Sequence, residues 1–357
     1  MIKSEEPTHN MISNQVIWRS PSNIAFVKYW GKKGFQIPAN PSLSMTLAKS
    51  FTETSVGYFQ TEKPGQVSFE FSFENQDNSA FAEKIGRYLE NLSNEFPYIK
   101  HHHFQIESKN TFPHSSGIAS SASAMSALAL CLCDIWQNLE KSWMPVDDFY
   151  RKASTVARIG SGSAARSLFT GVSMWGKTEV FPASSDEFAI PVNENIHPVF
   201  AGLRDTILVT NKGVKKVSSR EGHKLMENHP MARARYQQAH QNLKKILEAL
   251  QSGNFEFFTE IIENEALTLH AMMMTSSPGY LLMNSATMQI IQKIRDFREQ
   301  TGTNVCFTLD AGPNVHVLYP ENSESDVKSF IENELRGLCE EGFMIHDRMG
   351  IGPLKIK

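Results

Sequence analysis

The chain has 357 residues, of which 35 are basic and 38 acidic, giving a formal net charge of −3. This length is enough for two domains, each with its own hydrophobic core. Because no long block carries charge of one sign, the composition argues against a nucleic acid or a membrane surface as partner, although a small anionic substrate would need only a few local basic residues.

The four cysteines follow neither a zinc-binding spacing nor a disulfide framework, which fits a reducing compartment. They are Cys131, Cys133, Cys306 and Cys339. The first 14 residues are polar and acidic, unlike a signal peptide, and no apolar run reaches membrane-spanning length. We therefore expect a cytoplasmic protein.

The first hundred residues predict a β-rich opening. After a loose arm to about residue 15, alternation predicts a strand that Pro21 and the segment 31–34 interrupt, and a second strand over 42–47. The following patterns predict two strand-like runs within 51–73, a helix over 80–92 and a strand over 101–108. The three consecutive histidines at 101–103 cannot all face one ion, so we interpret them as a strand edge or loop.

The segment 110–124, NTFPHSSGIASSASA, predicts a glycine-rich turn before a helix over 121–139. The first turn of a helix has unpaired N–H groups and partial positive charge, so small residues there admit a phosphate. A helix cap at Ser120 or Ser121 explains the same residues. The segment lacks the Gly-Lys-Ser/Thr ending of a P-loop NTPase.

A second helix is predicted over 146–159, and GSGSAARSLF follows at 160–169. Its glycines and serines form another small-residue turn before a helix start, from which Arg166 projects. From the residues alone, a plain turn between helices with a surface arginine explains this segment at least as well.

The pattern changes near Glu194, which predicts one domain over 1–193 and another over 194–357. In the second domain we expect three long helices (225–251, 254–273 and 285–300), a shorter one over 324–338, strands over 205–210, 303–309 and 315–319, and strand-like ends at 343–346 and 353–356. A polar turn, 213–220, contains VSSR, and Asp310-Ala311-Gly312-Pro313-Asn314 joins two of the strands.

Five segments together resemble the diphosphomevalonate decarboxylase family of the GHMP kinase superfamily. They are SPSNIAFVKYWGKKG (20–34), NTFPHSSGIASSASA (110–124), GSGSAARSLF (160–169), VSSREG (217–222) and TLDAGPNVHVLY (308–319). The resemblance spans almost the whole chain and implies a two-domain α+β GHMP fold, with an N-terminal domain like domain 2 of ribosomal protein S5, a ferredoxin-like C-terminal domain, and an active site in the cleft between them.

The resemblance also implies an activity. Enzymes of this family phosphorylate the 3-hydroxyl of mevalonate 5-diphosphate with ATP, and loss of phosphate and CO2 then gives isopentenyl diphosphate. Asp310 matches the catalytic aspartate, Lys28 the lysine beside it, and Arg166 the arginine that binds the substrate carboxylate. A carboxylate near a poorly nucleophilic tertiary hydroxyl is chemically suited to be its base or orienter.

The resemblance assigns further binding residues and ligands. Substrate contacts are expected from Asn23, Tyr29, Lys32, Ser161, Ser163, Ser219 and Arg220. ATP phosphates are expected at Gly117, Ala119, Ser120 and Ser121, with Asn110 on the nucleotide side. Mg2+ would bridge the phosphates with few or no dedicated carboxylates, so no metal ligand is assigned, and the family implies a homodimer.

Two alternatives remain at this stage. One is a related kinase that only phosphorylates mevalonate or its 5-phosphate, against which Lys28 beside Asp310 and the VSSR segment argue. The other is a GHMP-fold protein without catalysis that binds a regulatory ligand, which predicts losses at Asp310, Arg166 or the phosphate loop that this sequence does not show.

Overall fold

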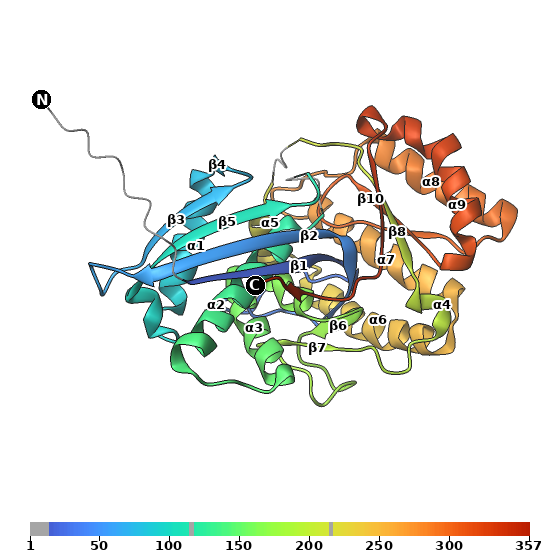
Figure 1. Ribbon diagram of the computed structural model, residues 1–357. Helices are drawn as coiled ribbons and strands as arrows, with labels where there is room; N and C mark the ends of the chain where they lie inside the picture. The colour runs from blue at the N-terminus through green and yellow to red at the C-terminus, as the bar shows by residue number, and fades with distance from the viewer. Residues whose placement is uncertain (1–13, 114–117, 214–216) are drawn as a thin grey trace, which may run out of the picture.

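The computed structural model describes residues 14–113, 118–213 and 217–357. These ranges form two sheets with helices packed against them, which confirms the α+β prediction. In Figure 1 the larger sheet and helices α1 to α3 form one half of the molecule, and the smaller sheet with α6 to α9 forms the other. None of the described helices is long and apolar enough to cross a bilayer.

The larger sheet has eight strands in the order β12-β1-β2-β5-β3-β4, with β6 beside β2 and β7 beside β6. Its pairs are antiparallel except β3 with β5. The strands are β1 (Asn14–Val27), β2 (Ser42–Gln60), β3 (Ser68–Phe73), β4 (Gln76–Asp77), β5 (His102–Asn110), β6 (Val172–Trp175), β7 (Ala189–Pro191) and β12 (Leu354–Lys355). The predicted strand over 42–47 and the run after residue 51 form one continuous strand, because no proline or glycine separates them.

Three helices cover one face of this sheet, close to the predicted positions. They are α1 (Ser79–Leu92), α2 (Ser120–Glu140) and α3 (Val146–Gly160). Their apolar sides pack with Val16, Trp18, Phe104 and Ile106 of the sheet in one core. All four cysteines are buried as free thiols. Of the three histidines expected at a strand edge or loop, His101 lies in a turn, whereas His102 and His103 begin β5, which pairs with β2 and β3 inside the sheet.

The smaller sheet is antiparallel, in the order β11-β8-β10-β9. Its strands are β8 (Arg204–Leu208), β9 (Cys306–Thr308), β10 (Val315–Tyr319) and β11 (Met344–Arg348). The helices of this half are α4 (Pro198–Ala201), α5 (Ser219–Leu225), α6 (Ala232–Ser252), α7 (Phe255–Met274), α8 (Ser285–Thr301) and α9 (Glu324–Phe330). A π-helical turn (Ile331–Leu335) and a 3-10 turn (Arg336–Leu338) extend α9 to the predicted end.

Two predictions about this half are wrong. The helix predicted over 225–251 begins only at Ala232, because Pro230 separates α6 from α5. Instead α5 begins inside the predicted polar turn, where Ser218 and Glu221 form a capping box. The strand predicted over 353–356 does not complete the second unit either. As β12 it pairs with β1, where Lys355 also binds Asp134 at 2.7 Å, so the end of the chain lies beside the first strand (Figure 1).

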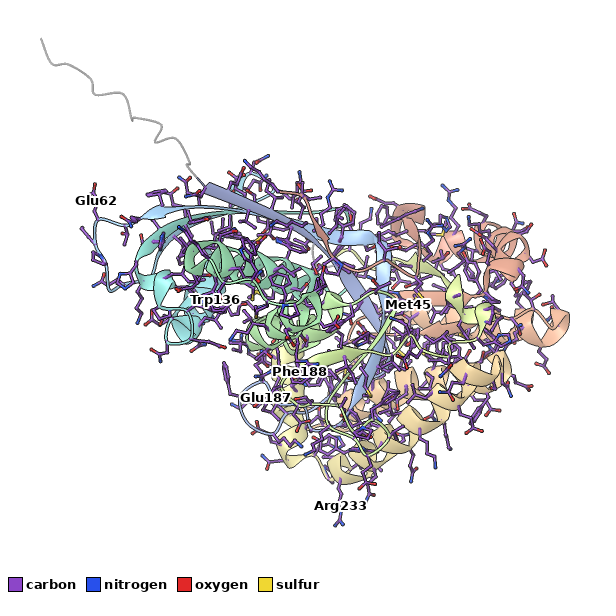
Figure 2. The ribbon with its side chains drawn as sticks, turned by 60° about the horizontal axis from the view of Figure 1, so that its bottom comes forward. Met45, Glu62, Trp136, Glu187, Phe188 and Arg233 are labelled. Carbon is purple, nitrogen blue, oxygen red and sulfur yellow. The ribbon has the colours of Figure 1, made fainter. Side chains whose placement is uncertain are left out.

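The two halves share a hydrophobic core. Ile24, Phe26 and Met45 of the larger sheet pack in the same cluster as Phe200 and Phe258 from the other half. Figure 2 shows Met45 inside the molecule, whereas Glu62 and Arg233 point outward. The second half of β1 is therefore buried on both faces, and it delivers Lys28 to the boundary between the halves. The domain division at 193/194 stays a prediction.

Candidate active site

A cavity of about 210 Å³ lies where segments from both halves meet. It is lined by the end of β1, the start of α2, the segment after α3, the first turn of α5 and the turn after β9. The predicted site residues that line it are Asn23, Lys28, Tyr29, Lys32, Ala119, Ser121, Ser161, Ser163, Arg166, Ser219, Arg220 and Asp310. The fold thus brings together the remote segments that the sequence singled out.

The remaining predicted ATP-binding residues lie beside this cavity or outside the described ranges. Asn110 and Ser120 line an adjacent, smaller cavity that shares Ser121 with the first. The Asn110 Nδ2 is buried without a hydrogen-bond partner among the described residues, so it can donate to a ligand. Gly117 lies outside the described residues.

The start of α2 tests one of the two interpretations of its serines, that of a helix cap. The residue before the helix is Ala119, whose φ of 45° lies in the left-handed region, and no side chain caps the helix there. Ser120 and Ser121 are already inside the first turn, so the interpretation of either as the helix cap is wrong. A strained backbone beside a cavity is typical of a functional turn.

Lys28 and Asp310 form an ion pair in the wall of the cavity. Lys28 follows β1 and Asp310 follows β9, and Lys28 Nζ donates to Asp310 Oδ1 at 3.0 Å. The lysine side chain is 2% exposed and that of the aspartate 26%. Burial lowers the pKa of Lys28, and the negative charges of Asp310 and Glu265 oppose that shift. The ammonium group is therefore fixed in a water-poor place next to the only carboxylate among the described residues that line the cavity.

Arg166 lies in a buried 3-10 helix, Gly162–Leu168. Its Nε donates to Ser44 Oγ at 3.0 Å, its Nη1 to Ser42 Oγ at 2.7 Å and its Nη2 to Asn23 Oδ1 at 3.4 Å. Burial lowers the pKa of Arg166 to about 10, against the opposing charge of Asp310. Neutral groups thus hold this guanidinium, and no carboxylate of the described residues forms a salt bridge with it. Such a group can receive a ligand carboxylate.

Tyr29 presents a second unsatisfied group. Its ring packs edge-on against Trp175, with centroids 4.7 Å apart, and its buried hydroxyl has no partner among the described residues. Burial raises the pKa of Tyr29, so the hydroxyl stays protonated and can donate. Gly162 makes room for this ring, because a Cβ at that position would lie 2.8 Å from it. The position of the Tyr29 ring therefore requires a glycine at 162.

Three cations gather at another part of the wall: Lys32, Lys84 and Arg220. Lys84 of α1 donates from Nζ to Ser121 Oγ at 2.6 Å. Burial, together with Arg220 and Lys32, lowers the pKa of Lys84 to about 8, and burial and Arg220 also lower the pKa of Lys32. Crowded cations that lower one another's pKa favour a polyanionic ligand.

Sequence reasoning missed Lys84 and His223. Lys84 carries no local signal, since a lysine on an amphipathic helix usually faces water. His223 lies on α5 between the rings of Tyr29 and Trp30, at centroid distances of 4.2 and 4.7 Å, and its Nδ1 accepts the Gly31 N–H at 2.9 Å. Burial, Lys32 and Arg166 lower the pKa of His223 to about 3, so it is neutral and its Nε2 carries the hydrogen.

Comparison with known proteins bears on this site directly. Residues 20–189 match the model of the diphosphomevalonate decarboxylase-like N-terminal domain, and residues 206–345 that of the mevalonate 5-diphosphate decarboxylase C-terminal domain. The diphosphomevalonate decarboxylase of Gibberella zeae is 30% identical over 325 residues, which cover 86% of this chain and 81% of the relative. The chain belongs to the diphosphomevalonate decarboxylase family.

Solved structures agree with this membership. The mevalonate diphosphate decarboxylase of Staphylococcus aureus superposes with a TM-score of 0.82 at 30% identity, covering 96% of this chain and 98% of that one. MDDEF in complex with MVAPP, AMPPCP and magnesium superposes with a TM-score of 0.81 at 27% identity, covering 96% and 99%. The expected GHMP fold is confirmed, and the chain is that of an ATP-dependent decarboxylase.

Proposed function

We propose that this protein converts mevalonate 5-diphosphate and ATP into isopentenyl diphosphate, ADP, phosphate and CO2, with Asp310, Lys28 and Arg166 as the reacting centre. The observation that carries these assignments is the composition of one cavity. It holds a lysine–aspartate pair, a buried arginine without a carboxylate partner, and a separate group of three cations. A substrate with a hydroxyl between a carboxylate and a diphosphate matches those three features.

In the first step the γ-phosphoryl group of ATP moves to the 3-oxygen of the substrate. Phosphoryl transfer depends mainly on positioning and charge stabilisation. Asp310 accepts or orients the hydroxyl hydrogen, and the Lys28 ammonium, which donates to the Asp310 carboxylate, stabilises negative charge on the reacting oxygens. Because Lys28 is buried, its charge acts in a medium of low effective dielectric constant.

In the second step the 3-oxygen leaves as phosphate and the bond between the carboxyl carbon and its neighbour breaks. The electron pair of that bond becomes the new double bond, and CO2 departs. Arg166 holds the carboxylate with its planar donors until this bond breaks, and Ser42, Ser44 and Asn23 fix the plane of the guanidinium. A lysine would neutralise the charge without fixing the carboxylate plane.

The diphosphate would lie at Lys32 and Arg220, with Ser161, Ser163, Ser219 and the Tyr29 hydroxyl as additional donors. The ATP phosphates would lie at the first turn of α2, where Ser120 and Ser121 offer hydroxyls and Lys84 a charge. Asn110 would donate to the nucleotide through its unpaired Nδ2.

Magnesium fits this site through its oxygen donors. The described residues hold no group of three His, Cys, Asp or Glu side chains arranged for a metal, but Mg2+ commonly binds through phosphate oxygens, waters and one or two carboxylates. Asp310 is the side chain that could take part, and the ion would neutralise phosphate charge during transfer. The homodimer and the cytoplasmic location stay predictions, as do the individual roles of the residues.

A product assay tests the activity. The purified protein is incubated with ATP, Mg2+ and carboxyl-labelled mevalonate 5-diphosphate, and ADP and labelled CO2 are measured in the same sample. We expect equal amounts of both. ADP without CO2 would favour the kinase alternative, and neither product would favour the alternative without catalysis.

A further inference from the structure

Helix α7 buries polar side chains on an otherwise apolar face. Glu265 is completely buried, and so is its partner Arg235 of α6. Arg235 donates from Nη2 to Glu265 Oε2 at 2.6 Å and from Nη1 to Glu265 Oε1 at 3.1 Å, and Asn242 Nδ2 donates to Oε1 at 2.7 Å. Replacing a buried ion pair by apolar residues often leaves stability unchanged or higher, so its presence calls for another reason.

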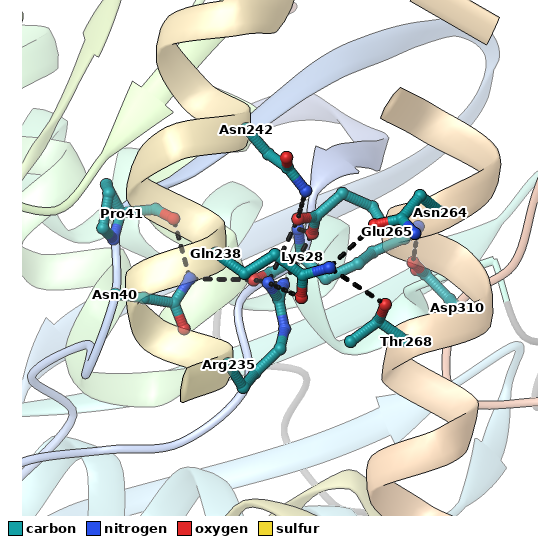
Figure 3. A network of polar contacts seen from close by, with 10 residues as sticks. All are labelled: Lys28, Asn40, Pro41, Arg235, Gln238, Asn242, Asn264, Glu265, Thr268 and Asp310. Atoms are coloured by element: carbon teal, nitrogen blue, oxygen red, sulfur yellow. Dashed lines mark hydrogen bonds and ion pairs between the residues drawn. The ribbon is translucent and has the colours of Figure 1, made fainter. Parts of the chain in front are cut away.

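The pair holds the main chain of Lys28. Glu265 Oε2 accepts the Lys28 N–H at 2.8 Å, and the Lys28 carbonyl accepts from Asn40 Nδ2 at 2.9 Å and from Arg235 Nη2 at 3.4 Å. Figure 3 shows Glu265 and Arg235 reaching from neighbouring helices to this one residue. Lys28 follows the end of β1 and lies in neither a helix nor a strand, so these contacts supply the order that regular structure does not.

The same helix also holds the main chain of Asp310. Five residues beyond Glu265, His270 Nε2 donates to the Asp310 carbonyl at 3.0 Å. Five residues along an α-helix span about 7.5 Å, so the two contact points are fixed on one rigid element. Lys28 comes from one half of the molecule and Asp310 from the other, yet both are attached to α7.

We propose that Glu265 and His270 are positioning residues and that α7 sets the separation between the Lys28 ammonium and the Asp310 carboxylate. The proposal rests on the roles given to Lys28 and Asp310 in the proposed function. In this proposal the buried pair Glu265–Arg235 affects catalysis only by positioning Lys28. The carboxylate of Glu265 orients the lysine main chain and touches no reacting atom.

Glu263 offers a matched control on the same helix. It is a buried carboxylate two residues from Glu265, and it binds Arg295 at 3.2 Å and Arg298 at 2.7 Å. None of its contacts involves Lys28 or Asp310. Removing the charge at position 263 therefore disturbs α7 in a similar way without releasing either active-site residue.

The test compares Glu265→Gln with Glu263→Gln by steady-state CO2 release and thermal unfolding. For Glu265→Gln we expect kcat to fall by about 10- to 100-fold, because small displacements of reacting groups cost that much, while KM for mevalonate 5-diphosphate changes by less than about threefold. For Glu263→Gln we expect kcat within about twofold of wild type despite a comparable fall in melting temperature. Equal kcat values for the two variants would overturn the proposal.

A second pair of variants decides the question if Glu265→Gln does not fold. His270→Leu removes the donor to the Asp310 carbonyl, and His270→Gln restores an N–H at a similar reach. We expect kcat to fall by about tenfold or more in the first and most of it to return in the second. The same low kcat in both would refute the positioning role. Absence of CO2 release by the wild-type protein would instead refute the proposed function.

Discussion

Two buried arginines of this molecule have opposite surroundings. Arg235 lies between α6 and α7 and is paired with the carboxylate of Glu265, whereas Arg166 lies at the cavity and is held by two serine hydroxyls and one amide oxygen. Both guanidinium groups have lost most contact with water. Of the two, only Arg235 forms a salt bridge with a carboxylate of the described residues.

The difference separates a structural charge from one reserved for a ligand. A buried, paired charge fixes geometry, and here it fixes the main chain of Lys28. A buried charge that is hydrogen-bonded but not neutralised lowers the stability of the ligand-free protein. Binding of an anion to that charge offsets this cost. Burial lowers the pKa of Arg166 but still leaves it charged at neutral pH, as a carboxylate receptor requires.

The largest effect is expected at Asp310, the one carboxylate among the described residues that line the cavity with Arg166. Asp310→Asn keeps the shape of the side chain but removes the proton acceptor, so kcat for CO2 release should fall by about 10³-fold or more. The matching ADP assay should fall equally, because phosphoryl transfer comes first. Activity above a tenth of wild type would contradict the assigned role of Asp310.

The next largest effect is expected in the free energy of unfolding when either arginine is replaced. Arg235→Met leaves Glu265 buried without its partner and should cost about 3–5 kcal/mol in the free energy of unfolding. Arg166→Met leaves only neutral groups unpaired and should cost about 1–3 kcal/mol. Urea unfolding of both variants measures the difference. An equal or larger loss of stability in Arg166→Met would contradict the distinction between a paired and an unpaired arginine.

A smaller effect is expected when Arg166 keeps its positive charge but loses its planar shape. Arg166→Lys keeps the positive charge but loses the planar fork, so kcat/KM for mevalonate 5-diphosphate should fall by about 100-fold. Its free energy of unfolding should stay within about 1 kcal/mol of wild type, since no ion pair within the described residues is lost. Near-normal turnover would mean that charge alone suffices there.

The smallest effect is a pH dependence at Lys84. Its pKa is lowered to about 8 in the folded protein, against about 10.4 for an ordinary lysine. The ligand-free protein should therefore gain stability as pH rises from about 8 to 10, because the unfolded chain still binds the proton that the folded chain has released. Over the same range the KM for ATP should rise, because Lys84 loses its charge.

Lys84→Met is the control for this pH effect. It should flatten both profiles between pH 8 and 10 while leaving the fold intact. Profiles of the variant that parallel those of wild type would show that another group is responsible.

The sequence predicted the long helices better than it predicted the chain's ends and connections. Local patterns identified α2 and α7 almost to their ends, because apolar spacing directly reflects which helix side is buried. The pairing of Leu354–Lys355 with β1 was missed because two residues carry no pattern that identifies a partner strand. Pro230 is the local signal for the break between α5 and α6, since proline interrupts a helix.

The candidate site residues could be named because they lie in short segments whose order resembles a family, and the fold places most of those described around one cavity. Glu265, Arg235 and Lys84 lie on helices with unremarkable sequence patterns. Their importance comes from what they touch across the fold, as when Glu265 binds a main-chain N–H more than two hundred residues away in the sequence. Such contacts have no local signature.

The most direct test of the account is a crystal structure of the protein with mevalonate 5-diphosphate and a non-hydrolysable ATP analogue. We predict the substrate carboxylate on the Arg166 guanidinium, the 3-hydroxyl within about 3 Å of an Asp310 oxygen, and the diphosphate at Lys32 and Arg220. A substrate bound in the reverse direction, with its diphosphate on Arg166 and its hydroxyl away from Asp310, would contradict the claim that this arginine is kept unpaired for the carboxylate.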